Sequence, residues 1–364
     1  VLTPQIGVRQ DRIHRPQRVG GIGVRRPHRP KGRHDAIAHE LVDDAAICLD
    51  DRHDAALALG LGSNPEIAAR ALAMLSGQSK AAMEELQELI KDEQFKDKPK
   101  LILGGGSNML FTRNVEGLVI KNNLKGIEKI AEDDDHVWIK SMSGEVWHEL
   151  VLYTIERNYG GIENLSLIPG SVGAAPIQNI GAYGVELVEV FEKLEAVDLQ
   201  AGDITEFDAE ACRFGYRNSI FKNEYKGRYF VTAVILRLNK QPKVNVTYGT
   251  IQQTLQEMAV NEVTIQHVSK AVCQIRSSKL PDPAKIGNAG SFFKNPEVPE
   301  ETLNQIQKSH PEVPYYPVRD NIVKIPAGWL IEQCGWKGKK VGNTGSHKDQ
   351  ALVLVNYGNA RGEE

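Results

Sequence analysis

The stretch KPKLILGGGSNML, Lys98–Leu110, sets a short apolar run directly before three consecutive glycines. The apolar run predicts a buried strand, and the glycines predict a turn that leads to the start of a second strand. Because glycine has no Cβ, consecutive glycines let backbone N–H groups approach an anion closely. The stretch therefore predicts a phosphate-binding cradle at the end of a strand.

This cradle does not fit the dinucleotide-binding pattern GxGxxG, which disfavours a Rossmann dehydrogenase. The third glycine of that pattern would fall at Met109, and no helical pattern follows. A near-copy, LGLGSN at Leu59–Asn64, is followed by Pro65, which cannot continue a central strand. We interpret the copy as a helix start capped by Ser63 or Asn64, and not as a second cradle.

The segments on both sides of the cradle alternate helical and strand patterns. Before it, one helical face carries Ala82, Leu86, Leu89 and Ile90. After it, residues 136–158 have the pattern of a strand, a turn and an amphipathic helix. Further strand patterns lie at GLVIKNN (117–123), RYFVTAVILRLN (228–239) and KVNVTYG (243–249). The alternation predicts an α+β chain with mixed sheets.

The composition is that of an ordinary soluble protein, with 364 residues, a net charge of −3 and 25% charged residues. This length allows two or three domains. No apolar run reaches membrane-spanning length, and the N-terminus lacks the apolar region of a secretory signal. Cys48, Cys212, Cys273 and Cys334 form no CxxC pair, which argues against a zinc site or a disulfide framework. We expect a cytoplasmic protein without a metal, whose thiols are small core residues.

The N-terminal region differs in composition from the rest of the chain. Residues 1–34 are rich in Arg, Pro, Gly and His, and residues 35–58 are acidic. A basic arm can bind nucleic acid, but here no aromatic residues are interleaved to stack bases. Pro and Gly also interrupt the amphipathic helix that a transit peptide would need. We interpret residues 1–75 as a disordered or poorly packed extension, with no nucleic-acid partner.

Three further segments are dense in residues with special backbone or chemical roles. Ser166–Leu187 combines glycines, prolines and small residues, which suits a loop that presses its backbone against a large flat ligand. Cys212–Lys222 supplies two arginines beside aromatic residues. Gly287–Pro296 presents Ser291 at a glycine turn, followed by Phe292 and Phe293, which we expect in the core together with Trp329.

These segments resemble the UDP-N-acetylenolpyruvoylglucosamine reductase (MurB) family of bacterial cell-wall synthesis, in the family's order and over roughly residues 79–359. SSKLPDP and AGWLIEQCG belong to the same resemblance, and Tyr248 matches a tyrosine of the type I branch. The resemblance implies an α+β fold: an FAD-binding domain of the vanillyl-alcohol-oxidase type with two subdomains, and a C-terminal α+β substrate domain. We place these parts at residues 76–128, 129–280 and 281–364.

The resemblance implies that NADPH reduces noncovalently bound FAD, which passes a hydride to the β-carbon of an enolpyruvyl UDP-sugar. The product, UDP-N-acetylmuramate, is a peptidoglycan precursor, which implies roles in cell-wall biogenesis, cell shape and cell division. The α-carbon then needs a proton, and its carboxylate needs a cation. Ser291 matches the family's proton donor, and Arg217 matches its enolate-stabilising arginine.

The resemblance also assigns binding residues. The substrate-binding positions fall at Tyr248, Lys279, Asn295, Tyr316, Lys324 and Gln350. The cofactor-binding positions fall at Gly104, Gly105, Gly106, Ser107, Asn108, Gly170, Ser171, Gly173, Ala174, Ile180, Gly181 and Tyr183. Lys324 and Tyr316 would meet the diphosphate of the substrate, and Arg276 would add positive charge. We expect a monomer without a membrane partner.

Two parts of the chain depart from the family. Nothing before about Ser79 matches the family's opening segment, which predicts that the LILGGG strand lacks an edge strand. The family's closing strand carries a glutamate, whereas this chain stops at NYGNARGEE, so we expect a C-terminally truncated substrate domain. Glu312 in PEVP precedes AGW, and Glu363 and Glu364 lie too near a free end to replace that glutamate. The alternative function is therefore a flavin- or nucleotide-binding protein of this fold with little reductase activity.

Overall fold

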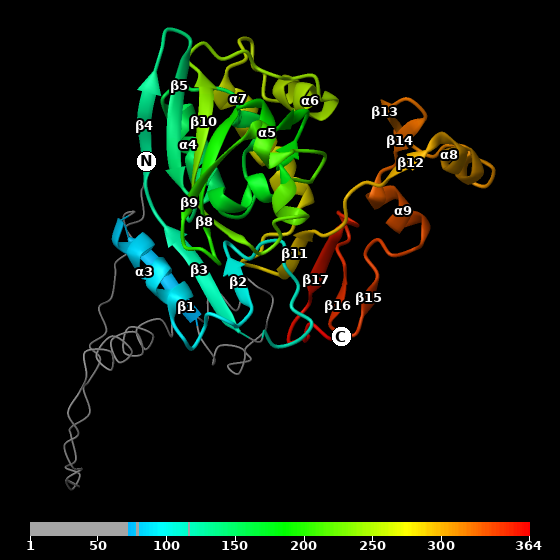
Figure 1. The fold of residues 1–364 in the computed structure, drawn as a ribbon. Coiled ribbons are helices and arrows are strands. Elements are labelled where there is room, and N and C mark those ends of the chain that lie inside the picture. Colours follow the sequence, from blue (N-terminus) through cyan, green and yellow to red (C-terminus); the bar gives the residue numbers. More distant parts are fainter. Residues whose placement is uncertain (1–71, 78–79, 116) are drawn as a thin grey trace, which may run out of the picture. The chain divides into compact units, whose positions relative to one another are not determined.

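The computed structural model describes residues 72–77, 80–115 and 117–364, whose helices and strands are drawn in Figure 1. The first sheet is parallel, with the strand order β1-β3-β2. It contains β1 (Leu72–Gly77), β3 (Leu118–Leu124) and β2 (Lys100–Leu103), and helix α3 (Lys80–Lys91) connects β1 to β2. Apolar side chains of α3 and β3 form one core cluster, with Leu86, Ile90, Leu118, Ile120 and Leu124.

The second sheet is antiparallel, with five strands in the order β4-β5-β10-β8-β9. Its members are β4 (Ile127–Glu132), β5 (His136–Met142), β10 (Tyr229–Asn239), β8 (Phe191–Asp198) and β9 (Ile204–Asp208). β5 buries every second residue, whereas the central strand β10 is buried along most of its length. The main core packs residues of β5 and β10 against helix α4 (Trp147–Glu156) and includes the wholly buried Trp147.

The chain between α4 and β8 is mostly irregular, yet it is anchored in the main core through Ile162, Leu165 and Val172. It contains the short 3-10 helices η2 (Glu163–Leu165), η3 (Val172–Ala174), η4 (Pro176–Gln178) and η5 (Leu187–Glu189). It also contains the hairpin of β6 (Gly181–Ala182) and β7 (Val185–Glu186). This irregular segment is therefore fixed by burial of its apolar side chains and not by regular hydrogen bonding.

Four helical elements lie between β9 and the C-terminal part. They are α5 (Ala209–Cys212), η6 (Ile220–Lys222), α6 (Gly249–Glu257) and α7 (Ile265–Lys279). α6 and α7 pack on each other through a separate apolar cluster that includes Ile251 and Val268. Thr264 caps α7, since its side chain accepts the N–H of His267.

The C-terminal part is built on two small antiparallel sheets. One has the order β11-β17-β16-β15, with β11 (Gly287–Ser291), β17 (Val353–Asn356), β16 (Thr344–Ser346) and β15 (Lys340–Val341). The other has the order β12-β14-β13, with β12 (Glu297–Pro299), β14 (Ile322–Lys324) and β13 (Tyr316–Arg319). Helices α8 (Glu300–Gln307) and α9 (Ala327–Gln333) accompany the second sheet. The core cluster here is small, with four buried residues, Leu303, Val313, Val323 and Ile325.

Several predicted elements are confirmed. The helical face of α3 is buried at Leu86 and Ile90 and packs at Leu89, while the side chain of Ala82 lies outside the described residues. The strand, turn and helix predicted over residues 136–158 are β5 and α4. The predicted strand at residues 228–239 is β10.

Two predicted strands are wrong. No strand begins at the glycine turn, because the chain from Gly104 to Val115 is irregular and β3 begins only at Leu118. KVNVTYG forms no strand, and the side chains of Asn164 and Asn245 make its contacts with other segments. The amide of Asn164 donates to the carbonyl of Asn245 at 2.9 Å, and the amide of Asn245 donates to Gly184 O at 3.2 Å.

Two of the predicted domain boundaries fall inside strands. The boundary at residues 75/76 falls inside β1, and the boundary at 128/129 falls inside β4. A strand that precedes α3 is present in this sheet, but it pairs with β3, so the LILGGG strand β2 has β3 and not β1 as its neighbour. Residues 1–71, including LGLGSN and Cys48, lie outside the described residues.

Among the described residues, no helix is both long and apolar enough to cross a bilayer. In the same part of the chain, no group of three or more His, Cys, Asp or Glu side chains is arranged to hold a metal ion. Cys212 is buried as predicted, Cys273 is half-buried, and Cys334 is exposed, so the prediction of core thiols is wrong for Cys334.

Candidate active site

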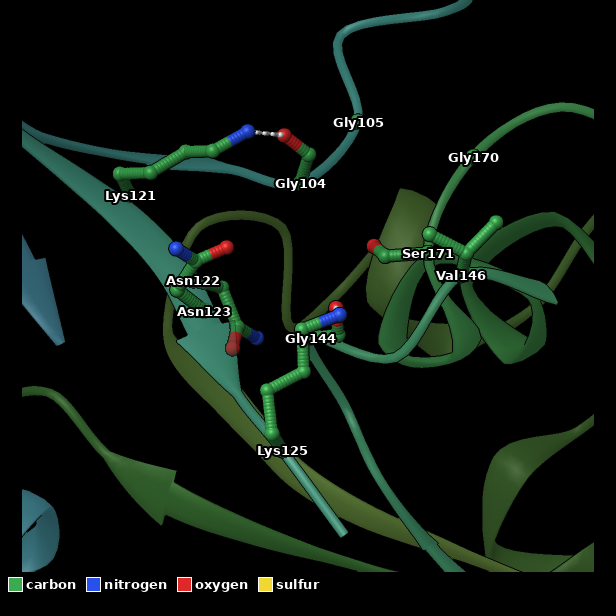
Figure 2. Close-up of a pocket in the computed structure, with 10 residues that line it drawn as sticks. All are labelled: Gly104, Gly105, Lys121, Asn122, Asn123, Lys125, Gly144, Val146, Gly170 and Ser171. Carbon is green, nitrogen blue, oxygen red and sulfur yellow. Dashed lines mark hydrogen bonds between the residues drawn. The ribbon is translucent and has the colours of Figure 1, made fainter. Parts of the chain in front are cut away.

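A cavity of about 180 Å³ lies where the two glycine-rich segments meet, and Figure 2 shows the residues around it. Its walls come from the turn after β2, from β3, and from the turns that precede α4 and η3. The lining residues are Gly104, Gly105, Lys121, Asn122, Asn123, Lys125, Gly144, Val146, Gly170 and Ser171. Both halves of the predicted cofactor cradle therefore contribute to one cavity.

The two glycine-rich segments approach each other so closely that side chains are excluded between them. A Cβ on Gly105 would lie 3.0 Å from the Cα of Gly170, and a Cβ on Gly104 would lie 2.5 Å from Ser171 Oγ. Gly106 and Gly170 have φ values of 67° and 116°, a region that favours glycine. The surface that this junction offers to a ligand is therefore largely backbone.

Backbone N–H groups are the main donors at the junction. Within the described part of the chain, the N–H groups of Gly105, Gly106, Ser107, Gly170 and Ser171 have no protein acceptor. Backbone N–H groups in folded proteins are nearly always paired, so a run of free ones around a left-handed glycine indicates an anion site. The junction fits the diphosphate of a dinucleotide cofactor.

Two lysines add positive charge to the same cavity. Lys121 Nζ donates to the carbonyl oxygen of Gly104 at 2.6 Å, and Lys125 Nζ donates to that of Gly144 at 2.7 Å. Burial lowers the pKa of Lys121, and the nearby Lys125 lowers it further, because both effects disfavour its charged form. A bound anion would offset both effects. Neither lysine was among the predicted site residues; Lys121 lies on β3 and Lys125 directly follows it, and their spacing of four residues suits one face of an extended chain.

The predicted proton donor, Ser291, lies at the end of β11 and is connected to the cradle through Asn108. The Asn108 amide donates to the carbonyl oxygens of Ala289, at 2.9 Å, and Ser291, at 3.2 Å. Gly290 between them has a φ of 64°, and a Cβ there would lie 2.9 Å from Ser107 O. Backbone contact and the Asn108 amide thus join the cradle turn to the strand that carries Ser291, whose residue surface is exposed.

The predicted enolate-stabilising residue, Arg217, lies against the β6–β7 hairpin. Its guanidinium donates to the carbonyl oxygens of Gly181 and, at 3.4 Å, Asn179, and lies 4.0 Å from Glu186 Oε1. Arg217 itself has a φ of 53°, which is uncommon for a residue with a side chain. The backbone carbonyls fix the plane of the guanidinium and leave further N–H groups for a ligand.

Two predicted substrate residues, Lys324 and Tyr248, each contact an aromatic ring. Lys324 Nζ lies 4.0 Å from the ring centroid of Tyr216, the neighbour of Arg217. Tyr316 on β13 is the direct cross-strand partner of Lys324 on β14. Tyr248 makes a separate contact, because it packs edge-to-face on Tyr183 with 5.4 Å between the ring centroids.

Other predicted residues have roles in the fold or stand apart. Asn295 Oδ1 accepts the N–H of Ala327 at 2.9 Å, at the start of α9. Lys279 is exposed at the end of α7. Gln350 lies near Gly328 of α9, where an added Cβ would be 3.9 Å from Gln350 Oε1.

Three of the residues that were predicted to bind the cofactor, Ile180, Ala174 and Gly173, lie at the edge of the cradle or beneath it. Ile180 is buried in the main core, and Ala174 is exposed on η3. A Cβ on Gly173 would lie 2.5 Å from the Cβ of Ser143, which is wholly buried. Gly173 therefore permits close packing under the cradle.

The expectation that Phe292 and Phe293 are core residues is wrong. Their exposed fractions are 41% and 49%, because they follow the last residue of β11 and stack edge-to-face on each other. Trp329 is partly buried against the small C-terminal cluster, as predicted, and packs on His310.

Comparison with known proteins identifies both parts of the chain. Residues 81–208 match the family model of the FAD binding domain. Residues 282–364 match that of the UDP-N-acetylenolpyruvoylglucosamine reductase C-terminal domain. The predicted α+β fold, with an FAD-binding domain and a C-terminal domain of this type, is confirmed, and so is FAD as the cofactor.

Individual relatives match over most of their length. The UDP-N-acetylenolpyruvoylglucosamine reductase of Flavobacterium johnsoniae is 52% identical over 284 residues, which are 78% of this chain and 84% of that protein. The reductase of Amoebophilus asiaticus is 51% identical over 278 residues, 76% of this chain and 82% of that protein. The crystal structure of the Thermus caldophilus reductase (MurB) aligns with a TM-score of 0.53 at 25% identity, covering 80% of this chain and 83% of that one.

Proposed function

Because the chain belongs to the UDP-N-acetylenolpyruvoylglucosamine reductase family, we propose that it uses NADPH and FAD to reduce UDP-N-acetylglucosamine enolpyruvate to UDP-N-acetylmuramate. It is a flavoprotein oxidoreductase. The observation that carries the detailed proposal is the pair of hydrogen bonds from Asn108 to β11. These bonds tie the cofactor cradle to the strand that ends in Ser291, which a reaction between cofactor and substrate requires.

The cradle would hold FAD noncovalently by its diphosphate. The free N–H groups of the Gly105–Ser107 turn and of Gly170 and Ser171 would bind phosphate oxygens, with Lys121 and Lys125 supplying charge. The residues that line the cavity include no His or Cys that could bond to the flavin. When bound, the flavin supplies the hydride for the β-carbon of the enolpyruvyl ether.

Arg217 and Ser291 would act on the other carbon of the same double bond. The N–H groups of Arg217 that do not contact Gly181 and Asn179 would bind the substrate carboxylate and the enolate charge that develops on it. Ser291 Oγ would give its proton to the α-carbon, since a neutral hydroxyl is a proton donor at any pH near 7.

The remaining substrate residues suit a UDP-sugar. Lys324 and Tyr316, paired across β14 and β13, would meet its diphosphate, with Lys279 and Arg276 adding charge. Tyr248, Asn295 and Gln350 would complete the substrate site. We further propose that the enzyme is monomeric and cytoplasmic and needs no nucleic acid or membrane. It would act in peptidoglycan precursor synthesis and so have roles in cell shape and division.

The test follows the flavin absorbance under anaerobic conditions. NADPH should bleach the flavin band, and the enolpyruvyl UDP-sugar should then restore it, with UDP-N-acetylmuramate as the product by mass spectrometry. Bleaching without reoxidation by this substrate would contradict the proposal and favour a flavin-binding protein with little reductase activity. Failure of NADPH to bleach the flavin would rule out NADPH as the reductant.

A further inference from the structure

Leu167 has an unusual backbone conformation immediately before the second half of the cradle. Its φ is 56°, in the left-handed region that side chains with a Cβ rarely adopt. Only Ile168 and Pro169 separate it from Gly170 and Ser171, which line the cavity. A residue persists in this region when its surroundings hold it there, and such positions gather at functional sites.

Two side chains hold both polar groups of Leu167. His148 Nδ1 accepts the N–H of Leu167 at 3.0 Å, and Arg276 Nε donates to its carbonyl oxygen at 3.1 Å. His148 belongs to α4 and Arg276 to α7. Side chains of two separate helices therefore hold the two peptide groups that flank the Leu167 Cα. Neither contact involves an atom of the cavity itself.

The segment from Leu167 to Gly170 is short, and hydrogen bonds hold it at both ends. The carbonyl of Gly170 accepts the N–H of Trp147 at 3.0 Å, so adjacent residues of α4 hold both ends of the segment from Leu167 to Gly170. Gly170 in turn lies against Gly105 with no room for a side chain. A change of backbone direction at Leu167 would therefore move the N–H groups of Gly170 and Ser171.

We propose that His148 and Arg276 are positioning residues that hold Leu167 in the left-handed conformation and so preorganise the Gly170–Ser171 half of the FAD cradle. This inference rests on the cradle being the cofactor site. It assigns Arg276 a contact with the protein backbone, where sequence analysis expected only positive charge for phosphate groups. It assigns His148 a role that no motif in the sequence indicated.

The contact to His148 depends on its protonation state. Nδ1 can accept the Leu167 N–H only when it carries no proton. Burial lowers the pKa of His148, Arg276 on α7 lowers it further, and the neighbouring Glu149 raises it, while Cys273 Sγ lies 4.0 Å from Nε2. Because the folded protein takes up this proton at a lower pH than the unfolded chain, the contribution of His148 to stability is present above pH 6.5 and declines as the pH falls below it.

Two substitutions of His148 separate its acceptor from its charge. Asn places Oδ1 at the same number of bonds from Cβ as Nδ1, so His148→Asn keeps an acceptor that cannot be protonated. His148→Ala removes the acceptor at every pH. His136→Asn is the matched control, because His136 lies on β5 and contacts Asp133 and Trp138.

The FAD dissociation constant of each protein is measured by fluorescence titration at pH 7.5 and pH 5.0. We expect His148→Ala to weaken FAD binding about tenfold at pH 7.5, the scale of one lost hydrogen bond to a preorganised site. We expect His148→Asn to bind within about threefold of the wild type at pH 7.5 and to lose less affinity at pH 5.0. The control His136→Asn should have the FAD dissociation constant of the wild type at both pH values.

Hydrogen exchange of the FAD-free proteins gives a second readout that does not depend on ligand. Peptides that contain residues 167–171 should exchange faster in His148→Ala and at the wild-type rate in His148→Asn, while wild-type exchange in the other peptides shows that the fold is kept. The inference is overturned if His148→Ala leaves both FAD affinity and exchange unchanged, or if His148→Asn behaves like His148→Ala. If the wild type binds no FAD, the assignment of the cradle fails, and exchange at residues 167–171 still decides the role of His148.

Discussion

The cofactor cradle and the substrate side of the C-terminal part are built in opposite ways. The cradle residues Ser171 and Gly173 are buried and flank Val172 of the main core, although Gly105 and Asn108 of the facing turn are exposed. On the substrate side, Ser291 and Tyr316 are exposed on short strands, and the second C-terminal sheet has a cluster of only four buried apolar residues. The contrast teaches that the cofactor side is ordered by the fold itself, whereas the substrate side presents charged and aromatic groups that a ligand would bury.

The sharpest test of this contrast is Ser291→Ala. Loss of a positioned proton donor typically costs about 10²–10⁴-fold in rate. We therefore expect reoxidation of the reduced flavin by substrate to slow by that factor, while flavin reduction by NADPH stays nearly unchanged. Stopped-flow absorbance resolves the two half-reactions, and Ser309→Ala at the exposed end of α8 is the control. Equal slowing of both half-reactions would make Ser291 a structural residue.

On the cofactor side, Gly173→Ala should damage the fold as well as the cradle. The new Cβ would lie 2.5 Å from the Cβ of the wholly buried Ser143. Overpacking of this kind costs about 1–3 kcal/mol, so we expect a lower melting temperature and weaker FAD binding together. Gly249→Ala is the matched control, because a Cβ at Gly249 meets nothing within 4 Å. If Gly173→Ala had wild-type stability and FAD affinity, the residues packed under the cradle would have to shift at little cost in free energy.

Lys121→Met tests whether charge in the cavity matters beyond the backbone cradle. It removes the ammonium that contacts Gly104 O while keeping an unbranched side chain. We expect FAD to bind about tenfold more weakly, and the affinity to depend less on salt concentration. Lys129→Met, at an exposed position on β4, should bind FAD like the wild type. An unchanged salt dependence in Lys121→Met would mean that the backbone alone holds the anion.

The smallest expected effect lies on the substrate side, at Tyr216. A cation–π contact that is open to solvent in part, such as that between Tyr216 and Lys324, contributes about 0.5–1 kcal/mol. Tyr216→Leu should therefore raise the KM for the UDP-sugar about two- to fivefold with FAD affinity unchanged, whereas Tyr216→Phe keeps the ring and should stay near the wild type. A change in FAD affinity in Tyr216→Leu would show that the two sides are not independent.

The sequence predicted those parts of the molecule whose chemistry is local. A glycine such as Gly106 signals its own backbone freedom, and alternation along β5 signals its buried face. The motifs around Ser291 and Arg217 were found in the same way, because their special residues are neighbours in the chain.

What the sequence did not predict depends on contacts between distant segments. KVNVTYG has strand-forming residues, but the carbonyl of Asn245 accepts from the side chain of Asn164, 81 positions away, and not from a neighbouring strand. Lys121 lines the cavity because β3 lies beside the cradle turn. Phe292 and Phe293 are exposed because β11 ends before them. Hydrophobicity and propensity do not encode where a strand ends relative to its neighbours.

The strand order β1-β3-β2 has a consequence for the assembly of the cofactor site during synthesis. The middle strand is the last of the three to leave the ribosome, and β1 and β2 have no other strand partner among the described residues. The glycine turn after β2 therefore cannot acquire its final shape until the chain has grown past Leu124. We expect β2 and β3 to gain protection together in pulse-labelled hydrogen exchange during refolding, with cofactor capture following that step.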